Sequence, residues 1–248
     1  KSVASSWHPW IRGDKLELPI QEDETALVIW TLWKHFDKYR DIEFVQPLYR
    51  ELIIRAAEFM TKFIDKETKL PLPSYDLWEE RHGVHTFTVA AVVAGIRAAG
   101  HFAAAFGEHD RAKKYFSVAD EMKNAMVKYL YNKVEKRFAR MGKKKGAGYE
   151  LDMNVDASLC GLFSFGVFSA YDPLVQSTMQ AVKDVLWVKT HVGGIARYVG
   201  DNYHRVSGDV NNVPGNPWFI CTMWLAEYEI SRAQNENDLK KALSILEW

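Results

Sequence analysis

The segment from His85 to Phe106 constrains the fold more than any other, because it is rich in alanine and valine and is apolar on nearly every side. A helix of this kind needs protein against all of its faces, so it is expected in the interior of a fold. The next segment, Asp110 to Tyr131, has apolar residues at helical spacing on one face and charged residues on the other. An inner helix followed by an outer one predicts a fold with two layers of helices.

Helical periodicity extends along most of the remaining chain. It predicts further helices over Glu22–Tyr39, Phe44–Ile64, Val155–Phe168, Pro173–Trp187, Asn216–Gln234 and Asn237–Trp248. The total of about eight helices alternates between apolar and amphipathic ones, which is typical of an all-α, double-layered toroid. The stretch Lys136–Tyr149 is expected to be non-helical, with a solvated hairpin tip. No linker is long enough to divide the chain, so residues 1–248 are expected to form a single domain.

Composition excludes several classes of partner. Hydrophobic residues make up 48% of the chain, which indicates a globular protein. Lysine plus arginine and aspartate plus glutamate each number 32, so the formal net charge is zero. A zero net charge argues against a nucleic-acid partner and suits a neutral substrate such as a sugar.

No apolar run is expected to reach the length of a membrane span, so no membrane partner is predicted. The first residues do not resemble a signal peptide, and a cytoplasmic location is slightly favoured.

The two cysteines, Cys160 and Cys221, both lie in apolar helical surroundings. Buried free thiols are therefore expected rather than a disulfide framework. A group such as Asp76, Glu79, Glu80 and His85 could gather a cation, but nothing in the spacing fixes a metal geometry. Neither a metal site nor a cofactor is predicted.

A loop before the apolar helix places two adjacent carboxylates beside a tryptophan, in Leu72-Pro-Ser-Tyr-Asp-Leu-Trp-Glu-Glu-Arg81. A carboxylic acid kept protonated near an aromatic residue that stacks on sugars is what acid-catalysed glycoside cleavage needs. Two glutamates before a helix are more often a solvated first turn that favours the helix dipole. The residues of this loop alone leave both interpretations open.

Three other blocks accompany this loop: Pro19-Ile-Gln-Glu-Asp-Glu-Thr-Ala-Leu27, Gly193-Gly-Ile-Ala-Arg-Tyr198 with Asp201 and Tyr203, and Pro214-Gly-Asn-Pro-Trp-Phe-Ile-Cys-Thr-Met-Trp224. In these four blocks, which span residues 19 to 224, the chain resembles glycoside hydrolase family 15, the glucoamylases, and in particular their bacterial and archaeal branch. The resemblance implies the (α/α)6 barrel fold, here incomplete. It also implies an α-linked glucose oligosaccharide as substrate, cleaved from its non-reducing end by an inverting acid/base mechanism.

The resemblance also assigns roles to residues of the Trp-Glu-Glu motif. It implies that Glu79 is the catalytic general acid, and that Trp78 and Glu80 hold the sugar beside the scissile bond. Partial burial of Glu79 against Trp78 is expected to favour the neutral form of its carboxyl group.

In the third and fourth blocks, the resemblance implies that Arg197 and Asp201 bind substrate. It also implies that Trp218 contacts a sugar through its aromatic ring.

Two pieces of the family pattern do not occur in this sequence. One is the Pro-Glu-Gln-like motif that carries the general base, and the other is an upstream Trp-x-Arg-Asp motif that grips the terminal glucose. The chain is therefore expected to be an internal piece of a catalytic domain, with uncovered apolar faces that favour self-association. Two alternatives remain open: a trehalase or glucodextranase of the same family, and a catalytically incomplete fragment that only binds sugar.

Overall fold

The computed structural model describes residues 10–12, 15–17 and 19–247, and these divide into two compact units. The amino-terminal unit holds Lys1–Tyr129 with Gly142–Glu150, and the carboxy-terminal unit holds Leu130–Met141 with Leu151–Trp248. The expectation of a single domain stays a prediction.

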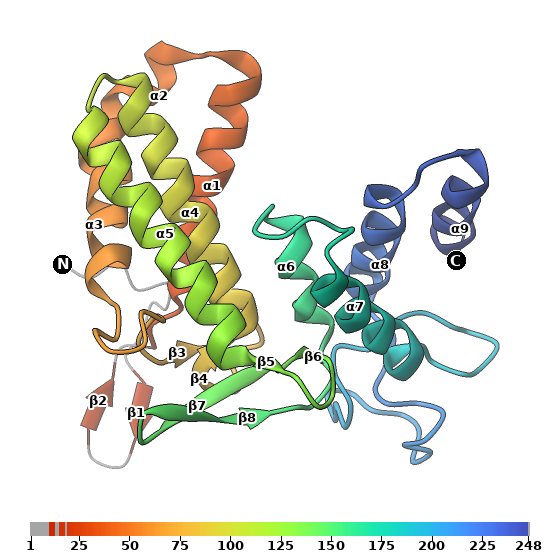
Figure 1. Cartoon of the computed structure of the whole chain (residues 1–248). Coiled ribbons are helices and arrows are strands. Elements are labelled where there is room, and N and C mark those ends of the chain that lie inside the picture. The colour runs from red at the N-terminus through yellow and green to blue at the C-terminus, as the bar shows by residue number, and fades with distance from the viewer. Residues whose placement is uncertain (1–9, 13–14, 18, 248) are drawn as a thin grey trace. The chain divides into compact units, whose positions relative to one another are not determined.

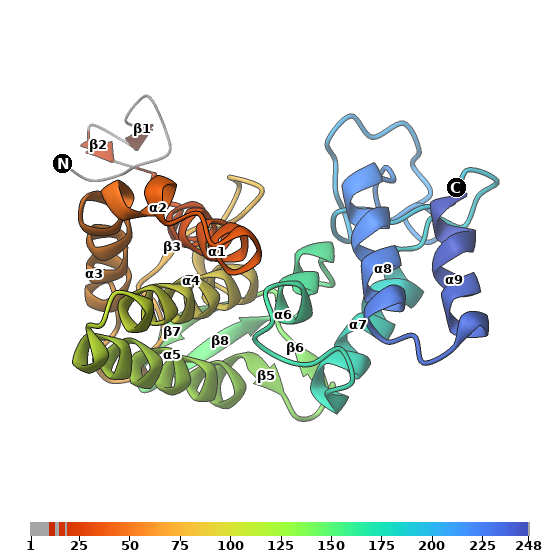
Figure 2. The same cartoon turned by 90° about the horizontal axis from the view of Figure 1, so that it is seen from above.

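The amino-terminal unit is built around a buried helix, as the sequence predicts. Its α-helices are α1 (Glu22–Tyr39), α2 (Ile42–Leu48), α3 (Arg55–Lys62), α4 (Thr86–Ala105) and α5 (His109–Leu130). Helix α4 lies between α1 and α5 (Figures 1 and 2). Helices α4, α5 and α1 confirm the predicted inner, outer and first helices. The observed ends lie within a residue or two of the predicted ends.

Close approach of α1 to α4 depends on Gly95. A Cβ atom added at this position would lie 2.8 Å from the backbone oxygen of Ala26 on α1. On the other side of α4, Arg97 Nη2 donates a hydrogen bond of 2.8 Å to Asp120 of α5. Helix α4 is also long and apolar enough to cross a membrane, so the expectation that no segment reaches that length is wrong. However, 83% of the apolar window of α4 is buried inside the protein, as in the core helix of a globular fold.

The predicted helix Phe44–Ile64 is interrupted in its hydrogen bonding, although the chain stays helical as far as Lys62. Helix α2 is followed by the π-helical turn Tyr49–Ile54 and then by α3. Pro47 lies inside α2 and has no amide hydrogen to donate. The wider turn directly after it is a common way to accommodate such a break in the hydrogen-bond ladder.

Short strands, which helical periodicity cannot predict, complete the amino-terminal unit. Strands β1 (Trp10–Arg12) and β2 (Lys15–Glu17) form an antiparallel pair. A four-stranded sheet has the order β3–β4–β7–β8, with its strands at Ser74–Tyr75, His82–His85, Met141–Lys145 and Gly148–Asp152. The turn between β7 and β8 contains Gly146 at φ 59°, which confirms the expected hairpin tip.

The carboxy-terminal unit carries the remaining helices. They are the 3-10 helix η2 (Ala157–Cys160), α6 (Gly161–Ser164), α7 (Pro173–Leu186), α8 (Phe219–Ser231) and α9 (Glu236–Leu246). Two short strands, β5 (Tyr131–Asn132) and β6 (Arg137–Phe138), pair in antiparallel fashion. Helices α8 and α9 pack side by side (Figure 2). The 3-10 helix η2 packs against α7 and α8.

Two helix predictions in this unit need correction. The expected helix Val155–Phe168 is reduced to η2 and α6, because the chain leaves the helix near Gly166, whose φ of 71° is left-handed. The expected helix Asn216–Gln234 begins only at Phe219, after Pro217. The last helix ends at Leu246, and Trp248, to which it was expected to extend, lies outside the described residues.

Candidate active site

The Trp-Glu-Glu motif lies in a loop that joins two paired strands of the amino-terminal unit. Strands β3 and β4 pair with Tyr75 opposite His82, and the loop between them holds residues 76–81. The amide of Asp76 donates a hydrogen bond of 3.0 Å to the carbonyl of Arg81, which closes the loop at its base. Trp78, Glu79 and Glu80 are therefore carried on the tip of a hairpin.

Asp76 fixes the conformation of this loop. Its side chain is 6% exposed, and its Oδ1 accepts hydrogen bonds from the backbone nitrogens of Glu80 at 2.7 Å and Arg81 at 3.0 Å. Its backbone oxygen accepts from the amide of Glu79 at 2.9 Å. From the sequence, Asp76 was considered only as one of four residues that could gather a cation, although aspartate at the start of a turn commonly binds backbone amides further along.

Glu79 has a backbone φ of 58°, in the left-handed region that non-glycine residues rarely adopt. Such a conformation costs about 1–3 kcal/mol and persists where surrounding contacts hold it. Here the contacts made by Asp76 on both sides of Glu79 supply that constraint. Backbone strain of this kind, here at the residue expected to be the general acid, is often found at functional sites.

The two glutamates of the motif have different surroundings. Glu80 accepts a hydrogen bond of 2.9 Å from Arg81 Nη1, and the same nitrogen lies 3.4 Å from Asp76 Oδ2. Glu79 is exposed, whereas Trp78 is half-buried. The expected partial burial of Glu79 is therefore wrong for this chain, because the residue lies at the tip of the loop.

The loop is joined to the start of helix α1. The amide of Tyr75 donates to the carbonyl of Ile20 at 2.8 Å, and Gln21 Nε2 donates to the carbonyl of Asp76 at 3.1 Å. These contacts connect the first of the four sequence blocks, residues 19–27, with the Trp-Glu-Glu block. They also place the acidic first turn of α1 beside the loop.

That first turn contains three consecutive carboxylic acids with perturbed pKa values. Burial raises the pKa of Glu22 well above its usual range, and neither carboxylate oxygen has a hydrogen-bond partner within the described residues. Burial raises the pKa of Asp23 to about 6, despite a hydrogen bond of 3.2 Å from Thr88 Oγ1. Burial and the nearby carboxylate of Glu79 raise the pKa of Glu24. The sequence showed these acids, but not their burial.

In the carboxy-terminal unit, Arg197 and Asp201 form a buried bidentate ion pair. Arg197 Nε and Nη2 donate to the two carboxylate oxygens at 2.7 and 2.8 Å, and the side chains are only 6% and 0% exposed. Burial opposes ionisation of Asp201, but hydrogen bonds from Arg197 and from the amide of Tyr203 lower its pKa overall. Asp201 is therefore a fixed negative charge that holds the guanidinium in one orientation.

Three aromatic rings surround this guanidinium. Its central carbon lies 5.0 Å from the ring centre of Trp218, 5.1 Å from that of Tyr203 and 5.3 Å from that of Tyr198. Tyr203 is 53% exposed, so this cluster presents an aromatic surface to solvent. Such a surface beside charged hydrogen-bonding groups has the chemistry of a sugar-binding site.

Backbone contacts bring the third and fourth sequence blocks together. The amide of Trp218, the N-cap of α8, donates to the carbonyl of Ile195 at 2.9 Å. Gly215 passes so close to Asp201 that an added Cβ would lie 2.8 Å from the Cβ of that aspartate. Glycine is therefore required here for close approach rather than for chain flexibility.

The structure thus gathers the predicted residues into two groups, one in each unit. Trp78, Glu79 and Glu80 share the loop between β3 and β4, whereas Arg197, Asp201 and Trp218 form the second group. Among the described residues, no three histidine, cysteine or acidic side chains are placed to hold a metal ion. Cys160 and Cys221 are both buried and free, as predicted.

Comparisons with known proteins point to one family. The family model "Glycosyl hydrolases family 15" matches residues 8–247. An uncharacterized glycosyl hydrolase of Methanocaldococcus jannaschii is 28% identical over 100% of this chain and 39% of its own length. A glucoamylase of Clostridium sp. is 25% identical over 94% of this chain and 34% of its own length. The chain therefore spans between a third and two fifths of these relatives.

The solved structure of a bacterial glucoamylase complexed with acarbose is similar over 95% of this chain and 36% of its own, with 25% identity and a TM-score of 0.70. This likeness confirms the predicted fold class, the all-α (α/α)6 barrel, of which the chain supplies a part. With a family model that matches almost the whole chain, the assignment is direct: the chain belongs to glycosyl hydrolase family 15.

Proposed function

We propose that the protein containing this chain is a glycoside hydrolase that releases glucose from the non-reducing end of α-glucans, with Glu79 as general acid. The observation that carries the proposal is the loop geometry, in which Asp76 fixes the backbone on both sides of an exposed Glu79. Membership of the family supports a glycosidase, and the similar glucoamylase complexed with acarbose supports an oligosaccharide ligand.

In this mechanism the neutral carboxyl group of Glu79 donates its proton to the glycosidic oxygen as the bond to the sugar breaks. A positioned acid of this kind contributes about 10²–10⁴-fold to the rate. A second carboxylate on the opposite face would activate the attacking water, at a separation of about 6.5–9.5 Å from the acid, and would invert the anomeric centre. We assign no residue of this chain to that second role.

The remaining predicted residues would bind the sugar. The guanidinium of Arg197, which Asp201 orients, places a positive charge beside the half-buried ring of Trp218 and the exposed ring of Tyr203, and these two rings offer stacking surfaces for a pyranose. Trp78 and Glu80 would hold the sugar beside the scissile bond. The same groups suit trehalose and α-1,6-linked glucans, so linkage choice stays open between these substrates.

A second candidate function is a sugar-binding fragment without catalysis. It is favoured by the absence of a Pro-Glu-Gln triplet from these 248 residues. Self-association through apolar faces belongs to this candidate, and the described residues include exposed large hydrophobic side chains such as Leu243 at 51% exposure.

The test is the time course of glucose release from maltotriose, isomaltose and trehalose, with the anomeric form of the product followed by proton NMR. The proposal predicts that glucose appears first as the β anomer, from maltotriose faster than from the other two. Initial release of the α anomer would contradict the inverting mechanism. No release from any of the three would favour the sugar-binding fragment.

A further inference from the structure

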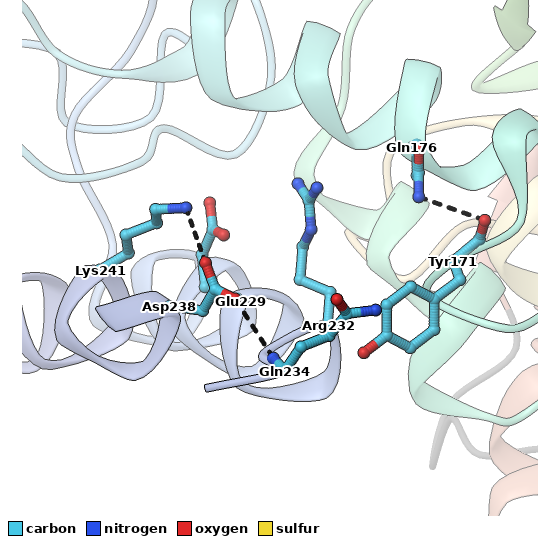
Figure 3. A pocket seen from close by; sticks show the side chains of 7 residues that line it. All are labelled: Tyr171, Gln176, Glu229, Arg232, Gln234, Asp238 and Lys241. Atoms are coloured by element: carbon cyan, nitrogen blue, oxygen red, sulfur yellow. Dashed lines mark hydrogen bonds and ion pairs between the residues drawn. The ribbon is translucent and has the colours of Figure 1, made fainter. Parts of the chain in front are cut away.

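We propose that a pocket between α7, α8 and α9 is a second sugar-binding site, separate from the candidate active site. The pocket lies within the carboxy-terminal unit and has a cavity volume of about 250 Å³ (Figure 3). Its walls come from the turn before α7, from α7 itself, from the carboxyl end of α8 and from the start of α9. None of its lining residues belongs to the Trp-Glu-Glu loop or to the Arg197 cluster.

Both acids of the pocket already have cationic partners. Glu229 Oε1 lies 2.9 Å from Lys183 Nζ, and Asp238 Oδ1 lies 3.0 Å from Lys241 Nζ. Asp238 Oδ2 also accepts hydrogen bonds from the amide of Gln234 at 3.2 Å and from Asn235 Nδ2 at 3.0 Å. These contacts fix the pocket walls before any ligand arrives, which lowers the entropic cost of binding.

Arg232 differs from these groups. It is the C-cap residue of α8, and its side chain extends toward α7 (Figure 3). Its guanidinium lies over the ring of Tyr228, 5.4 Å from the centroid, and its charge helps to lower the pKa of Asp238. A guanidinium has five N–H donors, so Arg232 can also donate hydrogen bonds to a ligand in the pocket.

The lining offers acceptors as well as donors. Gln176 Nε2 donates to the carbonyl of Tyr171 at 3.2 Å, which leaves its side-chain oxygen as an acceptor. Tyr171 is 44% exposed and forms an aromatic wall of the pocket. The pocket therefore offers hydrogen-bond donors, hydrogen-bond acceptors and an aromatic ring. These groups complement a ligand that has both polar groups and an apolar face.

These properties favour a neutral sugar over an anion. The charges of the lining cancel, since Arg232 and Lys241 stand against Glu229 and Asp238. An anion would meet two carboxylates at close range, whereas sugar hydroxyls can donate to them. The cavity is smaller than the roughly 300–1,000 Å³ of sites for drug-sized ligands, so it suits a single ring.

The identity of the sugar rests on the proposed function, which makes an α-linked glucose residue the natural occupant. A glucan held at a second site on the same protein would raise the effective concentration of its ends at the active site. The expected benefit is therefore greater for long glucans than for maltotriose.

The test is an amide NMR titration of the 248-residue chain with maltose. The proposal predicts saturable shifts at Tyr171, Gln176 and Arg232, and at least tenfold weaker binding there in Tyr171→Ala and Arg232→Met. Tyr39→Ala is the matched control, because Tyr39 is an exposed tyrosine at 61% exposure outside the pocket, and it should leave the titration unchanged. Circular dichroism checks that each variant is folded.

Two further experiments distinguish sugar binding at the pocket from anion binding there and from sugar binding at the Arg197 cluster. Acetate and phosphate at matched ionic strength should leave the pocket signals unchanged, and shifts with these anions but not with maltose would overturn the proposal. So would the absence of any shift with maltose at the pocket. Trp218→Ala should remove shifts around Arg197 and leave those around Arg232. Failure of glucose release with maltose still bound at the pocket would contradict the proposed function alone.

Discussion

The carboxylate of Asp76 accepts a hydrogen bond of 2.7 Å from the backbone nitrogen of Glu80, directly after the proposed acid. A buried carboxylate thus holds the backbone around a residue with left-handed dihedral angles. The consequence is that the position of Glu79 depends on a residue that need not touch the substrate.

Replacement of Asp76 tests this dependence. Asp76→Ala removes two charge-assisted hydrogen bonds to backbone amides and is expected to cost about 2–3 kcal/mol of unfolding free energy. Asp76→Asn keeps an acceptor oxygen and should cost less than half as much. Urea unfolding of both variants measures the difference, and equal losses would show that the hydrogen bonds to the loop are not what Asp76 contributes.

The ion pair of Arg197 with Asp201 predicts strong coupling between the two residues. Asp201→Leu removes the carboxylate that accepts two hydrogen bonds from a buried guanidinium and is expected to cost about 3–5 kcal/mol. The double variant Arg197→Met with Asp201→Leu should cost clearly less than the sum of the single variants. A double-mutant cycle by chemical denaturation measures the coupling, and additive costs would contradict a tight pair.

Gly215 is expected to tolerate no side chain. Gly215→Ala places a methyl group against Asp201 and should cost about 1–3 kcal/mol through overpacking, with weaker sugar binding at Trp218. Gly208→Ala is the matched control, since an added Cβ there meets nothing within 4 Å. The control should stay within about 0.5 kcal/mol of the parent chain. Equal stabilities of the two variants would mean that the loop at Gly215 moves aside.

The buried acid Asp23 predicts a specific dependence of stability on pH. Its pKa is raised to about 6 in the folded protein from an ordinary value of 3.8, so the folded state binds more protons than the unfolded state between these values. Stability should therefore fall as pH rises from about 4 to about 6, by roughly 2–3 kcal/mol from this group. Asp23→Asn should flatten that part of the curve. An unchanged pH dependence in Asp23→Asn would show that Asp23 is ionised in both states.

Sequence periodicity predicted the helices well where one residue pattern runs without interruption. The ends of α1 and α4 follow from apolar spacing, because each helix packs a long face against the other. Periodicity failed at Val155–Phe168, where apolar residues occur in a segment that a left-handed Gly166 ends early. An apolar run can belong to several kinds of buried segment, so its pattern does not fix its length.

The residues proposed for the candidate site could be named from the sequence, but the contacts that support them could not. Arg197 and Asp201 could be named from a sequence block, whereas the support of the acid loop by Asp76 depends on backbone conformation. The burial of Glu22 and the pocket at Arg232 arise from contacts between separate elements. Such contacts leave no periodic signal in one chain, so only the structure reveals them.

The most direct test of the role of Glu79 is glucose release from maltotriose by the protein that contains this chain beside its Glu79→Gln variant, with Glu67→Gln as a control at another exposed glutamate. We expect turnover in the parent protein and in the control, and its loss in Glu79→Gln with the circular dichroism spectrum and maltose binding preserved. Retention of a tenth or more of the parent rate in Glu79→Gln would contradict the assignment of Glu79 as the general acid.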